Sequence, residues 1–245
     1  MDTVNRCKIY SLARFVHPRQ HSLDWLAPGT APRKSVHVVH VVERTMGELA
    51  AWRPRTLARL LEGGAVVIVD CVAVWGRAVA QHASSGRIHY VRDAGVLSFS
   101  GLLGFLAQLA DAPAATLRRR CRAPATAPAP LAAVVLDNIS AYRAPPAALG
   151  ALRRALEHLQ LAHGCAVLTV GYGIEYYEGV ESSFPTRAGE VGPWPTRLDH
   201  AYLASMDAVV VPATEKVTAP SADAEKTRTA GRAAVPLPPG QSDVR

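Results

Sequence analysis

The sequence predicts an α/β fold in which a mainly parallel sheet is covered by helices on both faces. Apolar, β-branched runs alternate with stretches of helical periodicity along most of the chain. Several of these runs are apolar at nearly every position, which is typical of strands buried on both faces of a parallel sheet. The chain has 245 residues, 49% of them hydrophobic, so it can bury a substantial core.

The first half of the chain gives two strands and a helix between them. VHVVHVV at 36–42 predicts a strand, and a helix is expected over about 49–61. Gly63-Gly64 ends that helix, and AVVIVDCVAVW at 65–75 predicts the next strand. The apolar residues that share one face of the helix are Leu49, Trp52, Leu57, Leu60 and Leu61.

The second half repeats the alternation. The expected elements are a helix over about 99–111, a strand at 131–137, a helix over about 147–163 that begins after Pro145 and ends at Gly164, a strand at 165–170 and a last strand within ASMDAVVV at 204–211.

These elements divide the chain into three parts. We predict an N-terminal extension at 1–35, the core at 36–212 and a disordered tail at 213–245. Within the core, 113–130 is an insert rich in Pro, Ala and Arg, at first basic and helical and then a linker without regular structure.

Composition limits the class of protein. The formal charge of +7 and the pI near 9.5 mildly favour an anionic partner. The densest basic cluster, Arg118 to Arg120 with Arg122, is equally compatible with a solvated helix face. No apolar run approaches the length of about 18 residues that a membrane span needs, and the four cysteines lie far apart, as free thiols do in a reducing compartment. We expect an intracellular, soluble protein without membrane contact.

In parallel α/β sheets, ligands bind at the carboxyl ends of the strands, here the loops 43–48, 71–77, 138–146 and 171–197. A nucleotide site needs a glycine-rich loop, a lysine and a hydroxyl in the first of these. The loop from Glu43 to Leu49 has one glycine and no Gly-Lys-Ser/Thr, and Glu48 would repel a phosphate. The sequence therefore argues against a phosphate cradle.

Other catalytic patterns are weaker still. Asp137 ends an apolar strand, as in a magnesium-supporting Walker-B strand, but Asp137 and Asp70 can equally be structural caps. The chain has no G-x-S-x-G elbow, and its histidines and cysteines have no metal-binding spacing. No catalytic or metal site is predicted.

The order of these motifs resembles the RecA-like core of strand-exchange recombinases. More closely, the chain resembles the recombinase-paralogue family of platinum sensitivity protein three, a subunit of the fungal Shu complex. The collinear stretches are KIYSLARFV (8–16), VVIVDCVAVW (66–75), QHASSGRIHY (81–90), SGLLGFLAQLADAPAATLRRRC (100–121), VVLDNIS (134–140), GCAVLTV (164–170), YYEGVE (176–181) and PTRLDHAYLASMD (195–207).

The resemblance implies a subunit that is not an enzyme. The P-loop lysine and hydroxyl have no counterpart, the catalytic glutamate falls on Val72, and the glutamine that senses γ-phosphate falls near Tyr172. Only the degenerate Walker-B position remains, at Asp137. No cofactor or metal is implied.

The resemblance also implies DNA binding by the loops 138–146 and 171–197. Their basic residues are Arg143 in the first and Arg187 and Arg197 in the second. Trp194 could stack on a base or pack on the Pro-rich rim, and Arg197 could instead support the final strand. Two or three phosphate contacts give only weak, salt-sensitive binding, so a partner would supply the rest.

The implied protein is a nuclear, non-catalytic subunit of a DNA repair complex. It would form a heterodimer with a second Shu-complex paralogue, associate with the other Shu subunits, bind forked or single-stranded DNA and promote recombinase filament assembly in homologous recombination and error-free damage tolerance. The recombinase and its mediators would be indirect partners. Two alternatives are a protein-interaction scaffold without DNA contact and, on the strength of Asp137 alone, a divergent nucleotide-binding ATPase.

Overall fold

Six parallel strands form one sheet in the computed structural model, which describes residues 20–27, 35–121, 129–174 and 195–212. Their order across the sheet is β3-β2-β4-β5-β1-β6. The strands are β1 (Val38–Glu43), β2 (Ala65–Asp70), β3 (Ile88–Val91), β4 (Leu131–Asp137), β5 (Ala166–Tyr172) and β6 (Ala208–Val210). Strand β1 pairs with β5 and β6, the last two strands of the sheet to occur in the chain.

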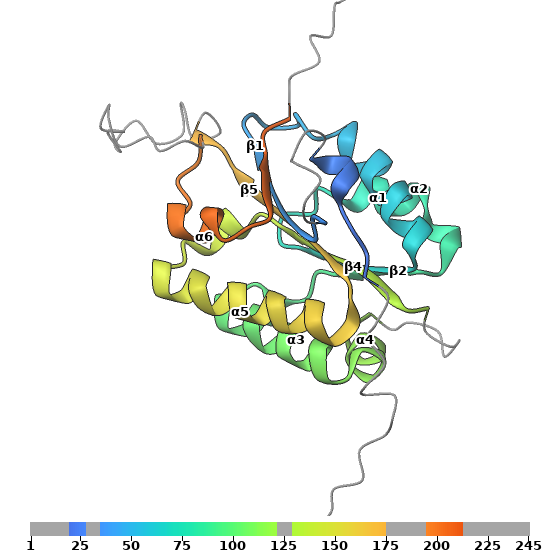
Figure 1. The fold of residues 1–245 in the computed structure, drawn as a ribbon. Helices are drawn as coiled ribbons and strands as arrows, with labels where there is room; N and C mark the ends of the chain where they lie inside the picture. Colours follow the sequence, from blue (N-terminus) through green and yellow to red (C-terminus); the bar gives the residue numbers. More distant parts are fainter. Residues whose placement is uncertain (1–19, 28–34, 122–128, 175–194, 213–245) are drawn as a thin grey trace, which may run out of the picture. The chain divides into compact units, whose positions relative to one another are not determined.

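Helices cover both faces of this sheet (Figure 1). One face carries α1 (Trp52–Gly63) and α2 (Gly76–Gln81), and the other carries α3 (Phe99–Asp111), α4 (Pro113–Cys121), α5 (Pro146–His163) and α6 (His200–Ala204). Each face has its own hydrophobic cluster, because the central strands are buried at every position and send alternate side chains to opposite sides. The predicted α/β fold, with helices on both faces, is confirmed.

Several element boundaries agree closely with the sequence. Helix α3 and strand β4 have the predicted bounds, and α1 and α5 end beside glycines as expected. Gly164 adopts the left-handed conformation, with φ of 64°, that closes a helix after its last turn.

Two predicted strands are wrong in part. Strand β2 ends at Asp70, because the Asp70 carboxylate accepts hydrogen bonds from the backbone N–H of Val72 and of Trp75 and turns the chain there. The start of the predicted last strand is instead the end of α6, which Asp199 caps by accepting from the Tyr202 N–H. Helix α2 and strand β3 were not predicted.

Part of the segment before β1 packs on the core. Leu23 is fully buried and Leu26 nearly so, both in the cluster beneath α1 and α2. The backbone N–H of His21 donates to the Gly164 carbonyl at 2.8 Å, and that of Leu23 donates to the Val36 carbonyl at 2.6 Å. The predicted domain boundaries stay predictions, since 1–19 and 213–245 lie outside the described residues.

Among the described helices, none combines the length and the apolar character that crossing a membrane requires.

Candidate functional site

Three buried carboxylates lie at the carboxyl edge of the sheet, one at the end of each of three strands. Glu43 ends β1, Asp70 ends β2 and Asp137 ends β4, and each is at most 2% exposed. They lie at the edge where α/β proteins bind ligands. The cation among them is Arg53, which comes from the second residue of α1 and is 3% exposed.

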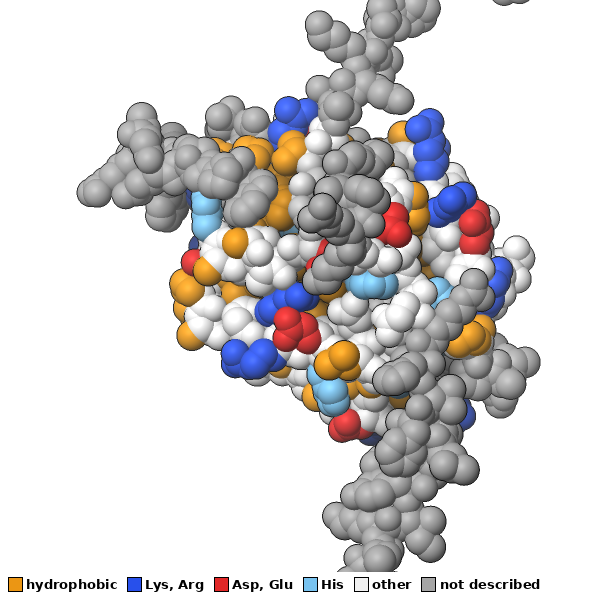
Figure 2. All heavy atoms as spheres, in the orientation of Figure 1, with side chains coloured by type: hydrophobic (Ala, Val, Ile, Leu, Met, Phe, Trp, Pro, Cys, Tyr) orange, Lys and Arg blue, Asp and Glu red, His pale blue; other side chains and the backbone are white. Residues whose placement is uncertain are grey.

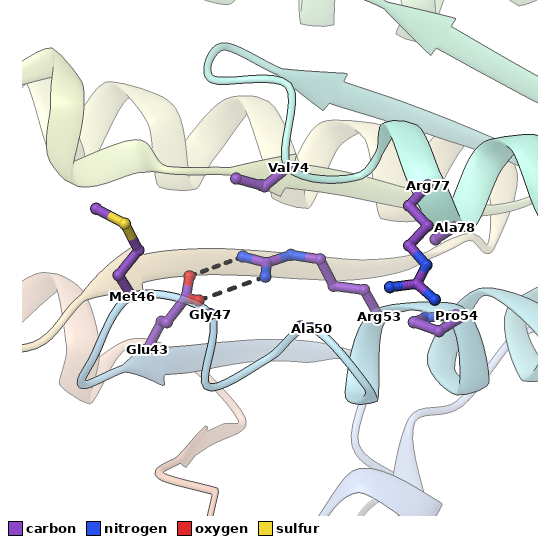
Figure 3. A pocket seen from close by; sticks show the side chains of 9 residues that line it. All are labelled: Glu43, Met46, Gly47, Ala50, Arg53, Pro54, Val74, Arg77 and Ala78. Atoms are coloured by element: carbon purple, nitrogen blue, oxygen red, sulfur yellow. Dashed lines mark hydrogen bonds and ion pairs between the residues drawn. The ribbon is translucent and has the colours of Figure 1, made fainter.

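Arg53 bridges two of these carboxylates. Its Nη2 donates to Glu43 Oε2 at 2.7 Å, and its Nη1 lies 3.4 Å from Glu43 Oε1 (Figure 3). Its Nε and Nη2 each lie 3.4 Å from Asp137 Oδ2. The indole N–H of Trp75 donates to the same Asp137 oxygen, and the centre of the Trp75 ring lies 6.0 Å from the Arg53 guanidinium carbon. The guanidinium is thus held on two sides by acids and on a third by an aromatic ring.

The charges of this cluster do not balance within the described residues. Burial raises the pKa of Asp137 to about 6, although the charge of Arg53 and the Trp75 hydrogen bond lower it. The second oxygen of Asp137, Oδ1, has no hydrogen-bond partner in the described structure. Burial lowers the pKa of Arg53, but the hydrogen bond to Glu43 and the charge of Asp137 outweigh it and raise that pKa. The arrangement keeps Arg53 charged and disfavours additional negative charge.

Asp70 organises the loop that follows β2. Its Oδ2 accepts from the Tyr90 hydroxyl at 2.7 Å and from the Trp75 N–H at 2.8 Å. Ala73 adopts a left-handed conformation, with φ of 66°, inside this turn. Val72, which the sequence resemblance predicts at the position of the recombinase catalytic glutamate, is an apolar side chain that is 43% exposed.

Tyr90→Phe is expected to lower the free energy of unfolding by about 1.5–3 kcal/mol, because it removes a hydrogen bond to a buried carboxylate. Urea denaturation measures this change. Tyr142→Phe is the control, since the described partners of the Tyr142 hydroxyl are neutral: the Val96 carbonyl at 2.6 Å and the Cys71 thiol at 3.0 Å. A loss from Tyr90→Phe no larger than that from Tyr142→Phe would contradict the role of Asp70.

The loop after β1 is closed by its own side chains. Glu48 Oε2 accepts from the backbone N–H of Arg44 at 2.7 Å, and Glu48 Oε1 accepts from the Arg44 guanidinium at 2.8 Å. The Glu48 carboxylate therefore binds a backbone N–H of this loop. In a phosphate cradle, such N–H groups bind the phosphate. The N–H groups of Glu48 and Ala50 donate to carbonyls within the same loop.

A pocket of about 200 Å³ opens beside Arg53 (Figure 3). Its walls are mostly apolar, with Met46 and Val74 at one end and Pro54 and Arg77 at the other. Met46 is 82% exposed. The pocket has no lysine or hydroxyl in its lining, so it offers none of the side chains with which a P-loop binds nucleotide and magnesium.

Two of the three predicted DNA contacts lie in the described structure, on adjoining loops. The Ser140 hydroxyl accepts from the Tyr172 N–H at 2.9 Å, and the Thr196 hydroxyl donates to the Tyr172 carbonyl at 2.8 Å. These bonds tie the loop after β4 to the segment after β5, and so bring Arg143 and Arg197 to one edge of the sheet. Both are exposed.

Arg187 and Trp194 lie outside the described residues. The DNA-contact assignments of all three arginines stay predictions. The described residues include no group of three or more His, Cys, Asp or Glu side chains that could hold a metal ion.

Sequence reasoning missed Arg53 and Glu43. A signal for Arg53 was present: it shares a helix face with Leu49, Leu57 and Leu60, four and seven residues away, and a charged residue on an apolar face implies a buried partner. No comparable signal identified Glu43, which reads as the first polar residue after a strand.

Comparison with known proteins gives a family. The family model described as "Shu complex component Psy3, DNA-binding description" matches residues 7–215. A search of the curated proteins finds no match. Among solved structures, the crystal structure of the RadB recombinase aligns with a TM-score of 0.48 and 16% identity, over 78% of this chain and 79% of that one. The family match spans nearly the whole chain and confirms the resemblance seen in the sequence: this protein belongs to the Psy3 family of Shu complex components.

Proposed function

We propose that this protein is a non-catalytic recombinase-paralogue subunit of a Shu complex, in which it binds forked or single-stranded DNA together with a second paralogue. In that role it promotes recombinase filament assembly during homologous recombination and error-free damage tolerance in the nucleus. The observation that carries the non-catalytic part is Arg53, whose guanidinium is bound by Glu43 and Asp137 at the carboxyl edge.

Phosphoryl transfer needs a phosphate cradle, a metal and a positioned water. In this chain the loop after β1 is closed by Glu48, and the retained Walker-B position, Asp137, is paired with Arg53 and Trp75. Val72 supplies no carboxylate to activate water. These features favour a subunit that acts by binding and not by hydrolysis.

DNA binding is supported by the family description and by the exposed arginines that follow β4 and β5. The Tyr172 N–H donates to Ser140 and the Tyr172 carbonyl accepts from Thr196, which joins those loops at one edge of the sheet. Because this chain supplies few basic residues there, the second paralogue contributes the remaining phosphate contacts.

We expect the complex of this chain with its paralogue partner to bind a labelled forked DNA with an affinity that falls steeply between low and physiological salt. Combining Arg143→Glu, Arg187→Glu and Arg197→Glu should weaken binding about tenfold or more. The slope of log affinity against log salt should fall by about one for each phosphate-binding arginine that is replaced. Fluorescence anisotropy measures both, and Arg154→Glu on the exposed side of α5 is the control.

Failure of the intact complex to bind at low salt would support the alternative, a scaffold that contacts only proteins. A nucleotide titration tests the other alternative. Magnesium-ATP binding that disappears on substitution of Thr45 or Asp137 would overturn the non-catalytic assignment.

A further inference from the structure

The arginine run of α4 takes no part in the function proposed above. The inner face of this helix is formed by Thr116 and Leu117, which are 0% and 5% exposed. Arg118 and Arg119 therefore point outward and are exposed, in a helix that has no acidic residue in its first turn or its last. The neighbouring outward residue is the exposed Ala115, whose small side chain leaves the two guanidinium groups accessible to a bulky ligand.

Helix α4 is anchored beside the edge strand β3. Arg120 Nη1 lies 2.9 and 3.0 Å from the two carboxylate oxygens of Asp93. Asp93 follows β3 by two residues, so this ion pair brings the last turn of α4 to the carboxyl end of that strand. The exposed Arg92 lies there too, with its guanidinium carbon 5.7 Å from the centre of the Tyr90 ring.

Positive charge is in excess at this corner of the sheet, where the last turn of α4 lies beside the carboxyl end of β3. Asp93 is already engaged by Arg120 and by the Gly95 N–H. Arg119 makes one long contact, 3.4 Å, to the neutral Gln108, and no described carboxylate pairs with Arg92, Arg118 or Arg119. Asp111, the other acid nearby, precedes the opposite end of α4.

Exposed arginines elsewhere are of two kinds. Arg59 on α1 pairs with Glu62 at 3.7 Å, whereas Arg55 and Arg154 pair with no described carboxylate; the end of α4 differs because several such arginines follow one another there. The face shown in Figure 2 has Arg side chains interspersed with Asp and Glu. Basic side chains in a last helical turn do stabilise the helix dipole, but that effect does not involve Arg92, which lies after a strand.

We propose that Arg92, Arg118 and Arg119 form a phosphate-binding surface that contacts the backbone of DNA at the β3 corner of the sheet. This inference rests on the proposed function and extends it to a second place on the same edge. The Tyr142 hydroxyl, one residue before Arg143, donates to the carbonyl of Val96, four residues after Arg92. The loop after β4 is thereby joined to the segment after β3, so DNA bound at Arg143 continues onto this surface.

This surface would bind the phosphate backbone of DNA without sequence specificity. Arginine binds phosphate oxygens through paired N–H donors and remains charged throughout the accessible pH range. The surface therefore adds affinity and orients the DNA without reading its sequence.

The test uses the complex of full-length chains and the labelled forked DNA, over a series of salt concentrations. Arg118→Ala with Arg119→Ala should weaken binding several-fold and lower the slope of log affinity against log salt by about 1.5–2, as expected when two phosphates are no longer neutralised. Alanine keeps the helix propensity high, so the fold is retained. Arg118→Lys with Arg119→Lys should restore most of the affinity, and Arg92→Ala should add to the loss.

Arg55→Ala with Arg59→Ala removes the same charge from exposed positions of α1, on the other face of the sheet, and is the matched control. Unchanged binding by the α4 variant, or an equal loss in the control, would overturn the inference while leaving the proposed function intact. If the α4 variant lost its co-purified paralogue partner and not its DNA binding, the inference would also be overturned, and this corner would be identified as a protein interface. Absence of DNA binding by the unsubstituted complex would instead refute the proposed function.

Discussion

Arg53→Met is expected to lower the free energy of unfolding by about 3–5 kcal/mol, the largest loss that we anticipate from one side chain. Methionine has a similar volume but no charge, so Glu43 and Asp137 would be left buried without a counter-ion. Urea denaturation at pH 7 measures the loss. It should shrink as the pH falls toward about 6, because Arg53 lowers the pKa of Asp137 and its loss lets the variant protonate this carboxyl at a higher pH than the wild type, in which the pKa is about 6.

Two variants separate charge from packing. Arg59→Met, on an exposed position of the same helix, should change stability by less than about 0.5 kcal/mol. Adding Glu43→Gln and Asp137→Asn to Arg53→Met should recover much of the stability, because removing a whole buried ion cluster is often nearly neutral. A triple variant as unstable as Arg53→Met would show that the guanidinium acts through its packing against Trp75.

His40 is expected to make the protein sensitive to acid. Its ring is fully buried in β1, with Nδ1 2.8 Å from the Thr169 hydroxyl oxygen, and Nε2 has no partner among the described residues. Burial lowers the pKa of His40 to about 3. Because the folded pKa lies below the unfolded value, the neutral ring contributes stability that is present above about pH 6.5 and is lost as the pH falls toward 3.

The loss attributable to His40 approaches about 1.4 kcal/mol per pH unit below 6.5, or about 2–3 kcal/mol between pH 6.5 and 4.5. His40→Asn keeps a polar atom beside Thr169 but cannot be protonated, so its stability should fall less over this interval. Denaturation at several pH values measures the difference, and the exposed His158→Asn is the matched control. Parallel pH profiles for wild type and His40→Asn would refute the assignment.

The sequence was most informative where an element is long and buried. Helix α3 and strand β4 were predicted with the bounds that the structure has. The helix shows a stripe of Leu and Phe at helical spacing, and the strand is an unbroken apolar run that ends in Asp137. Strand β3 was missed because it has only four residues and alternates half-buried with buried positions at an edge. Helix α2, with six residues, is too short to show a period.

The run 65–75 shows what composition cannot reveal. Its apolar residues continue past Asp70, yet the chain turns there because the Asp70 carboxylate accepts two backbone N–H groups and Ala73 takes a positive φ. Trp75, predicted in a strand, instead directs its indole to Asp137. Such contacts depend on which strand ends become neighbours.

The candidate site was predicted by location and only partly by residue. The expected edge of the sheet is the one where Glu43, Asp70 and Asp137 meet, and the absence of a P-loop lysine was evident from the sequence. The ion pair of Arg53 with Glu43 and Asp137 was not, because its members are 10 and 84 residues apart in the chain. Only the packing of α1 between the ends of β1 and β4 brings them together.

The position of β1 in the sheet has a consequence for synthesis of the chain. Although β1 is the first strand of this sheet to leave the ribosome, its neighbours β5 and β6 begin at Ala166 and Ala208. More than one hundred residues must be made before either edge of this apolar strand can pair, whereas β2 meets β3 within about twenty. The β2–β3 pair can therefore assemble early during translation, whereas Val38 to Val42 stays an unpaired apolar segment, open to aggregation, until β5 emerges.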